Sequence, residues 1–209
     1  MKNISERDQS KGYIPLRLII RDNMKIGIYI GSFNPPHKGH KKIINYLLTN
    51  KYVDKILIIP TGNYWHKQNL INIKDRINML KYYENKKIKV DTLYNNYQYT
   101  YQILRELIKK YNKEDLYLIL GADNIINFDK WDNFNELLTY NILIVNRDNI
   151  DVNSYIKEYP ANKISLVNGI KTVDICSTTL RNNLKYGKDT SDYIDRGILD
   201  YIVIHKLYK

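Results

Sequence analysis

Two histidines spaced three residues apart, His37 and His40, lie in the part of the sequence best suited to phosphate chemistry. Three lysines stand among and directly after them, and residues 25–49 contain no aspartate or glutamate. Imidazole and ammonium N–H groups donate strong hydrogen bonds to ionised phosphate oxygens, so this composition predicts an anion site. A zinc-binding pair of histidines is the alternative reading. It is disfavoured because no third and fourth ligand follows at a usable spacing.

A second group of residues with the same chemistry lies far along the chain. Ser177 and Thr178 carry hydroxyl groups that can cap a helix, and Arg181 follows one helical turn later. A guanidinium presents a planar fork of donors that matches two phosphate oxygens. Taken alone, this spacing also fits an ordinary capped helix without a ligand.

The first group must be positioned by a strand, a turn and a helix. Residues 26–30 alternate isoleucine with glycine and tyrosine, which predicts a short buried strand, and Gly31 ends it. Two prolines then exclude regular structure, and apolar residues recur at helical spacing from His40 onward. The start of a helix carries N–H groups without partners and the positive end of the helix dipole. We therefore expect that this helix start adds backbone donors to the anion site.

Strands and helices alternate through the rest of the chain. Apolar runs predict strands, and apolar residues at helical spacing predict helices. The predicted strands are 55–60, 88–93, 116–120, 142–145 and 164–167, with a further candidate at 172–175, and the predicted helices are 72–83, 100–111, 177–186 and 197–207. This order predicts an α/β fold, a Rossmann-like doubly wound parallel sheet in a single domain.

At this point the motifs resemble a known family. The string GSFNPPHKGH is similar to the (T/H)xGH signature of the nucleotidyltransferases, and ICSTTLR resembles their second motif, with Cys176 where serine is more usual. GADNIINFDKW, residues 121–131, resembles a segment of the nicotinate-nucleotide adenylyltransferases in particular. The resemblance covers residues 24–209, and residues 1–23 are expected to be an N-terminal extension outside the fold.

The resemblance implies a role for each matching residue. The residues implied to be catalytic are His37, His40 and Arg181. Those implied to bind ATP or its phosphates are Gly31, Ser32, Phe33, Lys67, Gly121, Asp123, Ser177 and Thr178. Those implied to bind the mononucleotide are His66, Thr100, Trp131 and Arg147, with Trp131 stacking on the pyridine ring. From the residues alone, His66 and Lys67 also fit a solvated loop, and Trp131 also fits the core.

The implied reaction transfers AMP from ATP to nicotinate mononucleotide, giving deamido-NAD and pyrophosphate, in NAD biosynthesis. Mg²⁺ is the expected cofactor, bound through the phosphates and water and not by protein ligands. Nicotinamide mononucleotide and pantetheine phosphate are alternative acceptors, and Asn34 leaves the choice between acid and amide open. A basic RNA-binding module without catalysis is the alternative outside this class.

Composition and charge indicate the kind of partner and the cellular location of the protein. The chain has 209 residues with 33 basic and 22 acidic side chains, a formal charge of +11, which favours an anionic partner. This excess is spread along the chain, so we do not expect a nucleic-acid partner. One cysteine is compatible with a reducing cytoplasm, where we expect the protein. No apolar run reaches membrane-spanning length, and a homo-oligomer is left open.

Overall fold

The computed structural model describes residues 24–62, 70–146, 150–157, 159–160, 162–170 and 176–209. The predicted extension at 1–23 and the candidate strand at 172–175 lie outside these residues. Within them, six parallel strands form one sheet in the order β3-β2-β1-β4-β5-β6. The strands are β1 Ile26–Gly31, β2 Lys55–Pro60, β3 Ile88–Val90, β4 Leu116–Gly121, β5 Asn141–Val145 and β6 Ile164–Val167. The predicted doubly wound, Rossmann-like sheet is confirmed.

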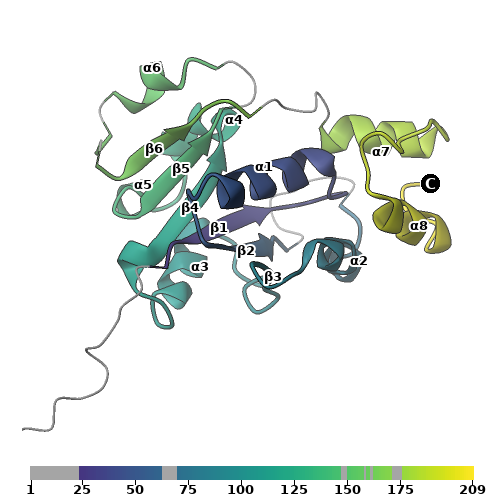
Figure 1. Ribbon diagram of the computed structural model, residues 1–209, viewed down its shortest axis with the longest axis horizontal. Coiled ribbons are helices and arrows are strands. Elements are labelled where there is room, and N and C mark those ends of the chain that lie inside the picture. The colour runs from purple at the N-terminus through teal and green to yellow at the C-terminus, as the bar shows by residue number, and fades with distance from the viewer. Residues whose placement is uncertain (1–23, 63–69, 147–149, 158, 161, 171–175) are drawn as a thin grey trace, which may run out of the picture.

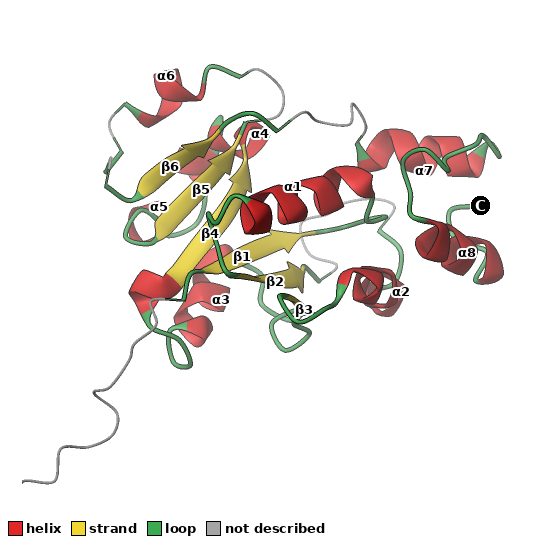
Figure 2. Ribbon diagram, viewed as in Figure 1, coloured by secondary structure: helices red, strands yellow, loops and turns green. Residues whose placement is uncertain are grey.

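Helices cover both faces of the sheet, as Figure 2 shows with red helices around yellow strands. The longer helices are α1 Lys38–Thr49, α2 Ile73–Leu80, α3 Thr100–Leu107, α7 Ser177–Lys185 and α8 Arg196–Ile204. Short helices lie between them: α4 Ala122–Ile125, α5 Phe134–Leu137 and α6 Val152–Ile156, with 3₁₀ turns η2 Lys81–Tyr83, η3 Lys113–Asp115 and η4 Phe128–Lys130.

The core has two halves, one on each face of the sheet. One cluster joins α1, α2, α7 and α8, and the other joins α3, α4 and α5 to the opposite face. Strands β2, β4 and β5 are almost continuous apolar runs because both of their faces are covered. Helices α7 and α8, in yellow-green, lie beside one another past one end of the sheet, close to the start of the purple helix α1 (Figure 1).

Several element bounds differ from the predictions. Strand β3 ends at Val90 because Asp91 Oδ1 accepts the Leu93 N–H at 2.8 Å, a local turn that competes with the strand. Helix α1 begins at Lys38, two residues before His40, because His37 caps it. Helix α3 ends at Leu107, after which the N–H of Lys110 bonds the Leu107 carbonyl in a tight turn.

Candidate active site

A cavity of about 810 Å³ opens at the carboxyl ends of β1 and β4, where the strand order reverses. This is the position at which open parallel sheets bind ligands. The predicted site residues that line it are Gly31, Ser32, Phe33, His40, Thr100, Gly121, Asp123, Trp131, Ser177, Thr178 and Arg181. His37 is buried beside the cavity and does not line it. His66, Lys67 and Arg147 lie outside the described residues.

The two histidines of the first motif hold each other in place. His37 Nδ1 accepts the Gly39 N–H at 3.1 Å, and His40 Nδ1 accepts the His37 N–H at 3.2 Å. A neutral imidazole that accepts at Nδ1 carries its hydrogen on Nε2. Each histidine is therefore set as an Nε2–H donor. The rings lie 3.8 Å apart between centroids, and His40 is the one that faces the cavity.

The start of α1 does not offer the backbone donors that we predicted. The Lys38 N–H bonds the Tyr193 carbonyl at 2.8 Å, and the His37 side chain accepts the N–H groups of Gly39 and His40. The first three N–H groups of the helix are thus already used. This prediction was wrong because a histidine, which is not a common capping residue, closes the helix with its own ring. An anion bound at this point would therefore meet side chains and not the free N–H groups of the helix.

The ring of Phe33 packs against the ring of His40. Its backbone has φ 48°, in the left-handed region that a bulky residue rarely adopts. Its ring meets Tyr29 edge-on at 5.3 Å and His40 at 5.0 Å, and only 3% of the residue is exposed. The strained turn therefore places an apolar ring where it fixes the orientation of an imidazole that faces the cavity.

The second motif contacts the turn of the first. The Ser177 hydroxyl donates to the Pro35 carbonyl at 3.1 Å, and Arg181 Nη1 donates to the Asn34 carbonyl at 2.9 Å. Arg181 Nη2 also donates to Thr178 Oγ1 at 3.1 Å. A guanidinium has five N–H donors, and Arg181 forms no ion pair among the described residues, so it keeps positive charge and donors at the cavity wall.

The cap of α7 is Cys176 and not Ser177 or Thr178, which lie within its first turn. Cys176 makes no side-chain cap hydrogen bond there, and its sulfur lies 3.3 Å from Thr179 Oγ1. The hydrogen bond between these two side chains lowers the pKa of the Cys176 thiol. The expectation that a hydroxyl caps the helix was wrong in position. Ser177 instead uses its hydroxyl to join the two motifs.

Arg76 is a site residue that the sequence analysis missed. Its side chain is fully buried, and Nη1 donates to the Ser32 carbonyl at 2.7 Å while Nε donates to the Ile71 carbonyl at 3.3 Å. Burial lowers the pKa of this guanidinium from its usual value. One feature of the sequence could have identified it: Arg76 lies on the same face of α2 as Met79 and Leu80, which are buried. A cation on an apolar face indicates a buried polar partner.

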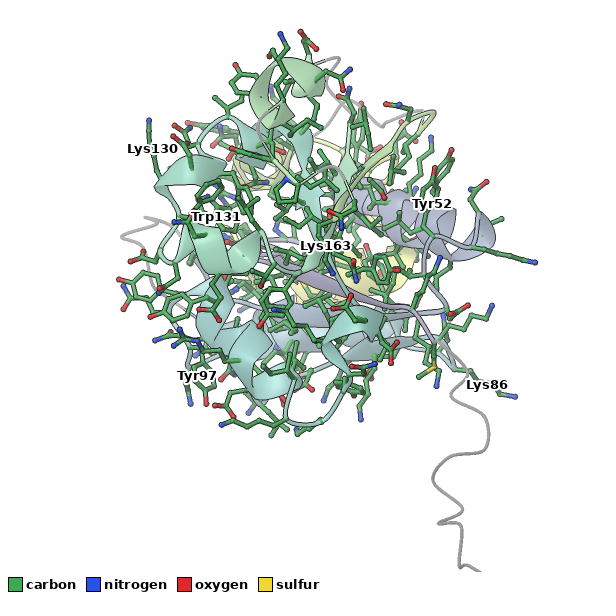
Figure 3. All side chains as sticks on the ribbon, turned by 90° about the vertical axis from the view of Figure 1, so that its left-hand side faces the viewer. Tyr52, Lys86, Tyr97, Lys130, Trp131 and Lys163 are labelled. Atoms are coloured by element: carbon green, nitrogen blue, oxygen red, sulfur yellow. The ribbon has the colours of Figure 1, made fainter. Side chains whose placement is uncertain are left out.

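Another part of the cavity lining comes from the carboxyl end of β4 and the segments after it. A Cβ at Gly121 would overlap Asp123 Oδ1, so any side chain at this position would force the Asp123 carboxylate to move. Trp131 packs edge-on against Phe128 with 5.2 Å between centroids, and it also lines the cavity. Trp131 therefore packs on the core and also lines the cavity, and its stacking on a pyridine ring stays a prediction. Tyr97, Lys130 and Trp131 lie along the same edge of the molecule in Figure 3.

No group of three or more His, Cys, Asp or Glu side chains that could hold a metal ion exists among the described residues. The cavity lining carries hydroxyl, imidazole and guanidinium groups, with Asp123 and Asp132 as its carboxylates. No helix in the described part of the chain combines the length and apolarity needed to cross a membrane.

Comparison with known proteins agrees with this geometry. A family model described as cytidylyltransferase-like matches residues 28–183. A probable nicotinate-nucleotide adenylyltransferase of Fusobacterium nucleatum is 37% identical over 183 residues, covering 84% of this chain and 95% of that protein. The chain belongs to the nicotinate-nucleotide adenylyltransferase family. The family predicted from the resemblance is confirmed.

Solved structures of this family share the fold. The nicotinic acid mononucleotide adenylyltransferase of Plasmodium falciparum, complexed with NaAD, is 25% identical with a TM-score of 0.76, covering 88% of this chain and 97% of that chain. The same protein complexed with APC is 26% identical with a TM-score of 0.72 and the same coverage. Another relative in this family, from Acholeplasma laidlawii, is 31% identical over 188 residues, covering 87% of this chain and 96% of that protein.

Proposed function

We propose that the protein transfers AMP from ATP to nicotinate mononucleotide, forming deamido-NAD and pyrophosphate in NAD biosynthesis. One observation carries the proposal: His40 and Arg181, from segments far apart in sequence, line the same cavity and are joined through the Asn34–Pro35 turn. The names of the relatives, which specify a nicotinate nucleotide, support the choice of acceptor.

In this proposal the triphosphate of ATP lies between the two motifs. A phosphate oxygen of the mononucleotide attacks the α-phosphorus, a new P–O bond forms, and the bond to the bridging oxygen breaks as pyrophosphate leaves. The chain supplies orientation and stabilises charge on the phosphoryl oxygens. His40 donates from Nε2, while Arg181 and the Thr178 hydroxyl donate from the second motif. The Ser177 hydroxyl, whose one O–H already donates to the Pro35 carbonyl, holds the two motifs together. His37 acts from behind, because it holds the His40 ring through its backbone N–H.

Mg²⁺ is part of the proposal as a component of the ATP complex. The cavity presents few carboxylates and several donors, which suits a metal ion held by phosphate oxygens and water. When bound, the ion neutralises phosphate charge.

Trp131 and Thr100 also line the cavity, and we assign the acceptor's pyridine ring to them. An indole face gains both burial and quadrupole contact from a flat ring. Arg147, His66 and Lys67 remain proposed contacts from the family resemblance. A cytoplasmic location belongs to the same proposal and is compatible with a chain that has a single cysteine.

The direct test is pyrophosphate release from ATP and magnesium with each acceptor in turn: nicotinate mononucleotide, nicotinamide mononucleotide and pantetheine phosphate. We expect the highest kcat/KM with the nicotinate compound and no turnover after EDTA. Faster turnover with the amide would correct the acceptor. No pyrophosphate release with any of the three would refute the proposed function.

Replacing His40 by alanine tests its role in the chemical step. The substitution removes the Nε2–H donor, so we expect kcat to fall by roughly 10²- to 10³-fold, with a much smaller rise in the KM for ATP. Steady-state kinetics at saturating mononucleotide give both values. An unchanged kcat with a raised KM would mean that His40 binds ATP equally in the ground state and the transition state.

A further inference from the structure

Tyr208, which lies beyond both motifs in the sequence, reaches the turn of the first motif. The Tyr208 hydroxyl donates to Asn34 Oδ1 at 2.9 Å, across 174 residues of sequence. Tyr208 does not line the cavity. Its contact therefore acts on the turn and not on a ligand.

The segment that carries Tyr208 is folded back by two left-handed residues. Helix α8 ends at Ile204, Lys206 has φ 52°, and the Leu207 N–H bonds the Ile202 carbonyl at 3.0 Å. Tyr208 itself has φ 62°. Left-handed conformations are unfavourable for such side chains and persist only where the surroundings hold them. Here Leu207 and Tyr208 pack against the core cluster beneath α1.

Asn34 is the junction on which these contacts meet. Its side-chain oxygen accepts from Tyr208 and, at 3.4 Å, from the Ile71 N–H, while its backbone carbonyl accepts from Arg181 at 2.9 Å. The residue is 2% exposed, so its polar atoms depend on protein partners. A change in the tilt of the Asn34 amide would move the carbonyl that orients Arg181.

We propose that Tyr208 is a positioning residue for the adenylyl transfer: its hydroxyl fixes Asn34, and Asn34 in turn orients the Arg181 guanidinium toward the cavity. The inference rests on the proposed function for its kinetic readout. Because burial raises the pKa of the Tyr208 phenol far above its usual value, the hydroxyl stays protonated and can donate throughout the neutral pH range.

The test compares two substitutions that each remove one tyrosine hydroxyl. Tyr208→Phe keeps the ring in the core and loses only the bond to Asn34. Tyr201→Phe is the matched control, because its hydroxyl bonds Asp75 and Asn78 at 2.9 Å, and neither lines the cavity. We expect Tyr208→Phe to lower kcat/KM for ATP by roughly three- to tenfold, through a lower kcat and a higher KM, and Tyr201→Phe to leave it unchanged.

A double substitution separates positioning from a general structural effect. In an Asn34→Ala background, Tyr208→Phe should cause no further loss, because the group it acts on is already gone. Full activity of Tyr208→Phe, or an equal loss with and without Asn34, would overturn the inference. If the unaltered protein releases no pyrophosphate, the proposed function fails separately. In that case, calorimetry measures the affinity of each variant for ATP. Several-fold weaker binding by Tyr208→Phe than by Tyr201→Phe would support the inference, and equal affinities would refute it.

Discussion

Arg76→Met tests the idea that a buried cation holds the turn after β1, which lines the cavity. The fully buried guanidinium donates to the carbonyls of Ser32 and Ile71 at 2.7 and 3.3 Å. Methionine fills much of the same volume but donates no hydrogen bond, so both carbonyls lose this donor in a dry environment. The Ser32 backbone should shift in the variant because its carbonyl loses this hydrogen bond, and Ser32 lines the cavity.

The expected loss follows from the hydrogen bonds and from burial. A hydrogen bond to a charged group contributes about 1.5–3 kcal/mol, and a buried carbonyl left without a donor costs about 1–3 kcal/mol. Removing the charge also removes its desolvation penalty, which offsets part of this sum. We expect a net loss of about 2–3 kcal/mol in the free energy of unfolding, a fall in Tm of roughly 4–12 °C for a domain of this size. Calorimetry measures the Tm, and pyrophosphate release well below it measures kcat, which should also fall.

Arg105→Met is the matched control. Arg105 also makes two hydrogen bonds, to the Glu136 carboxylate at 2.9 and 2.6 Å, but its side chain is 54% exposed. Solvent can replace these bonds, so we expect little change in Tm and none in kcat. Equal destabilisation by the two substitutions, or an unaltered Tm and kcat in Arg76→Met, would refute the reasoning from burial.

Two further substitutions test other parts of the site. Gly39→Ala would place a Cβ 2.8 Å from His37 Nδ1, so the imidazole ring must move and the helix cap is lost. We expect the free energy of unfolding to fall by about 1 kcal/mol and kcat to decrease. Wild-type kinetics would contradict the idea that the helix cap and the site are coupled. Trp131→Ala should raise the KM for the mononucleotide about tenfold with little effect on the KM for ATP, measured by varying each substrate in turn. A lower Tm with both KM values unchanged would show that the indole serves only the core.

The sheet and both motifs could be predicted from the sequence because their signals are local. Ile26–Gly31 and the string that follows it are contiguous, and apolar runs such as β4 need no tertiary information to be recognised. The doubly wound parallel sheet was predicted from the alternation of strands and helices, and the structure adds the order of its strands.

The supporting contacts could not be predicted because they depend on how distant segments pack. Arg76 reads as a surface residue of an amphipathic helix until its neighbours at Met79 and Leu80 are seen to be buried. The bond from Tyr208 to Asn34 spans almost the whole domain and leaves no spacing to detect. The prediction of free backbone donors at the start of α1 failed for a different reason. The His37 side chain accepts the N–H groups that a ligand would otherwise use, and the usual capping preferences for Ser, Thr, Asp and Asn do not predict a histidine cap.

The most direct test of the account is a crystal structure of the protein with magnesium and a non-hydrolysable ATP analogue. The account predicts that His40 Nε2 and the Arg181 guanidinium both lie within hydrogen-bond distance, about 2.7–3.2 Å, of oxygens on the same triphosphate. A triphosphate bound by only one of these two side chains, or bound outside the cavity between β1 and β4, would contradict it.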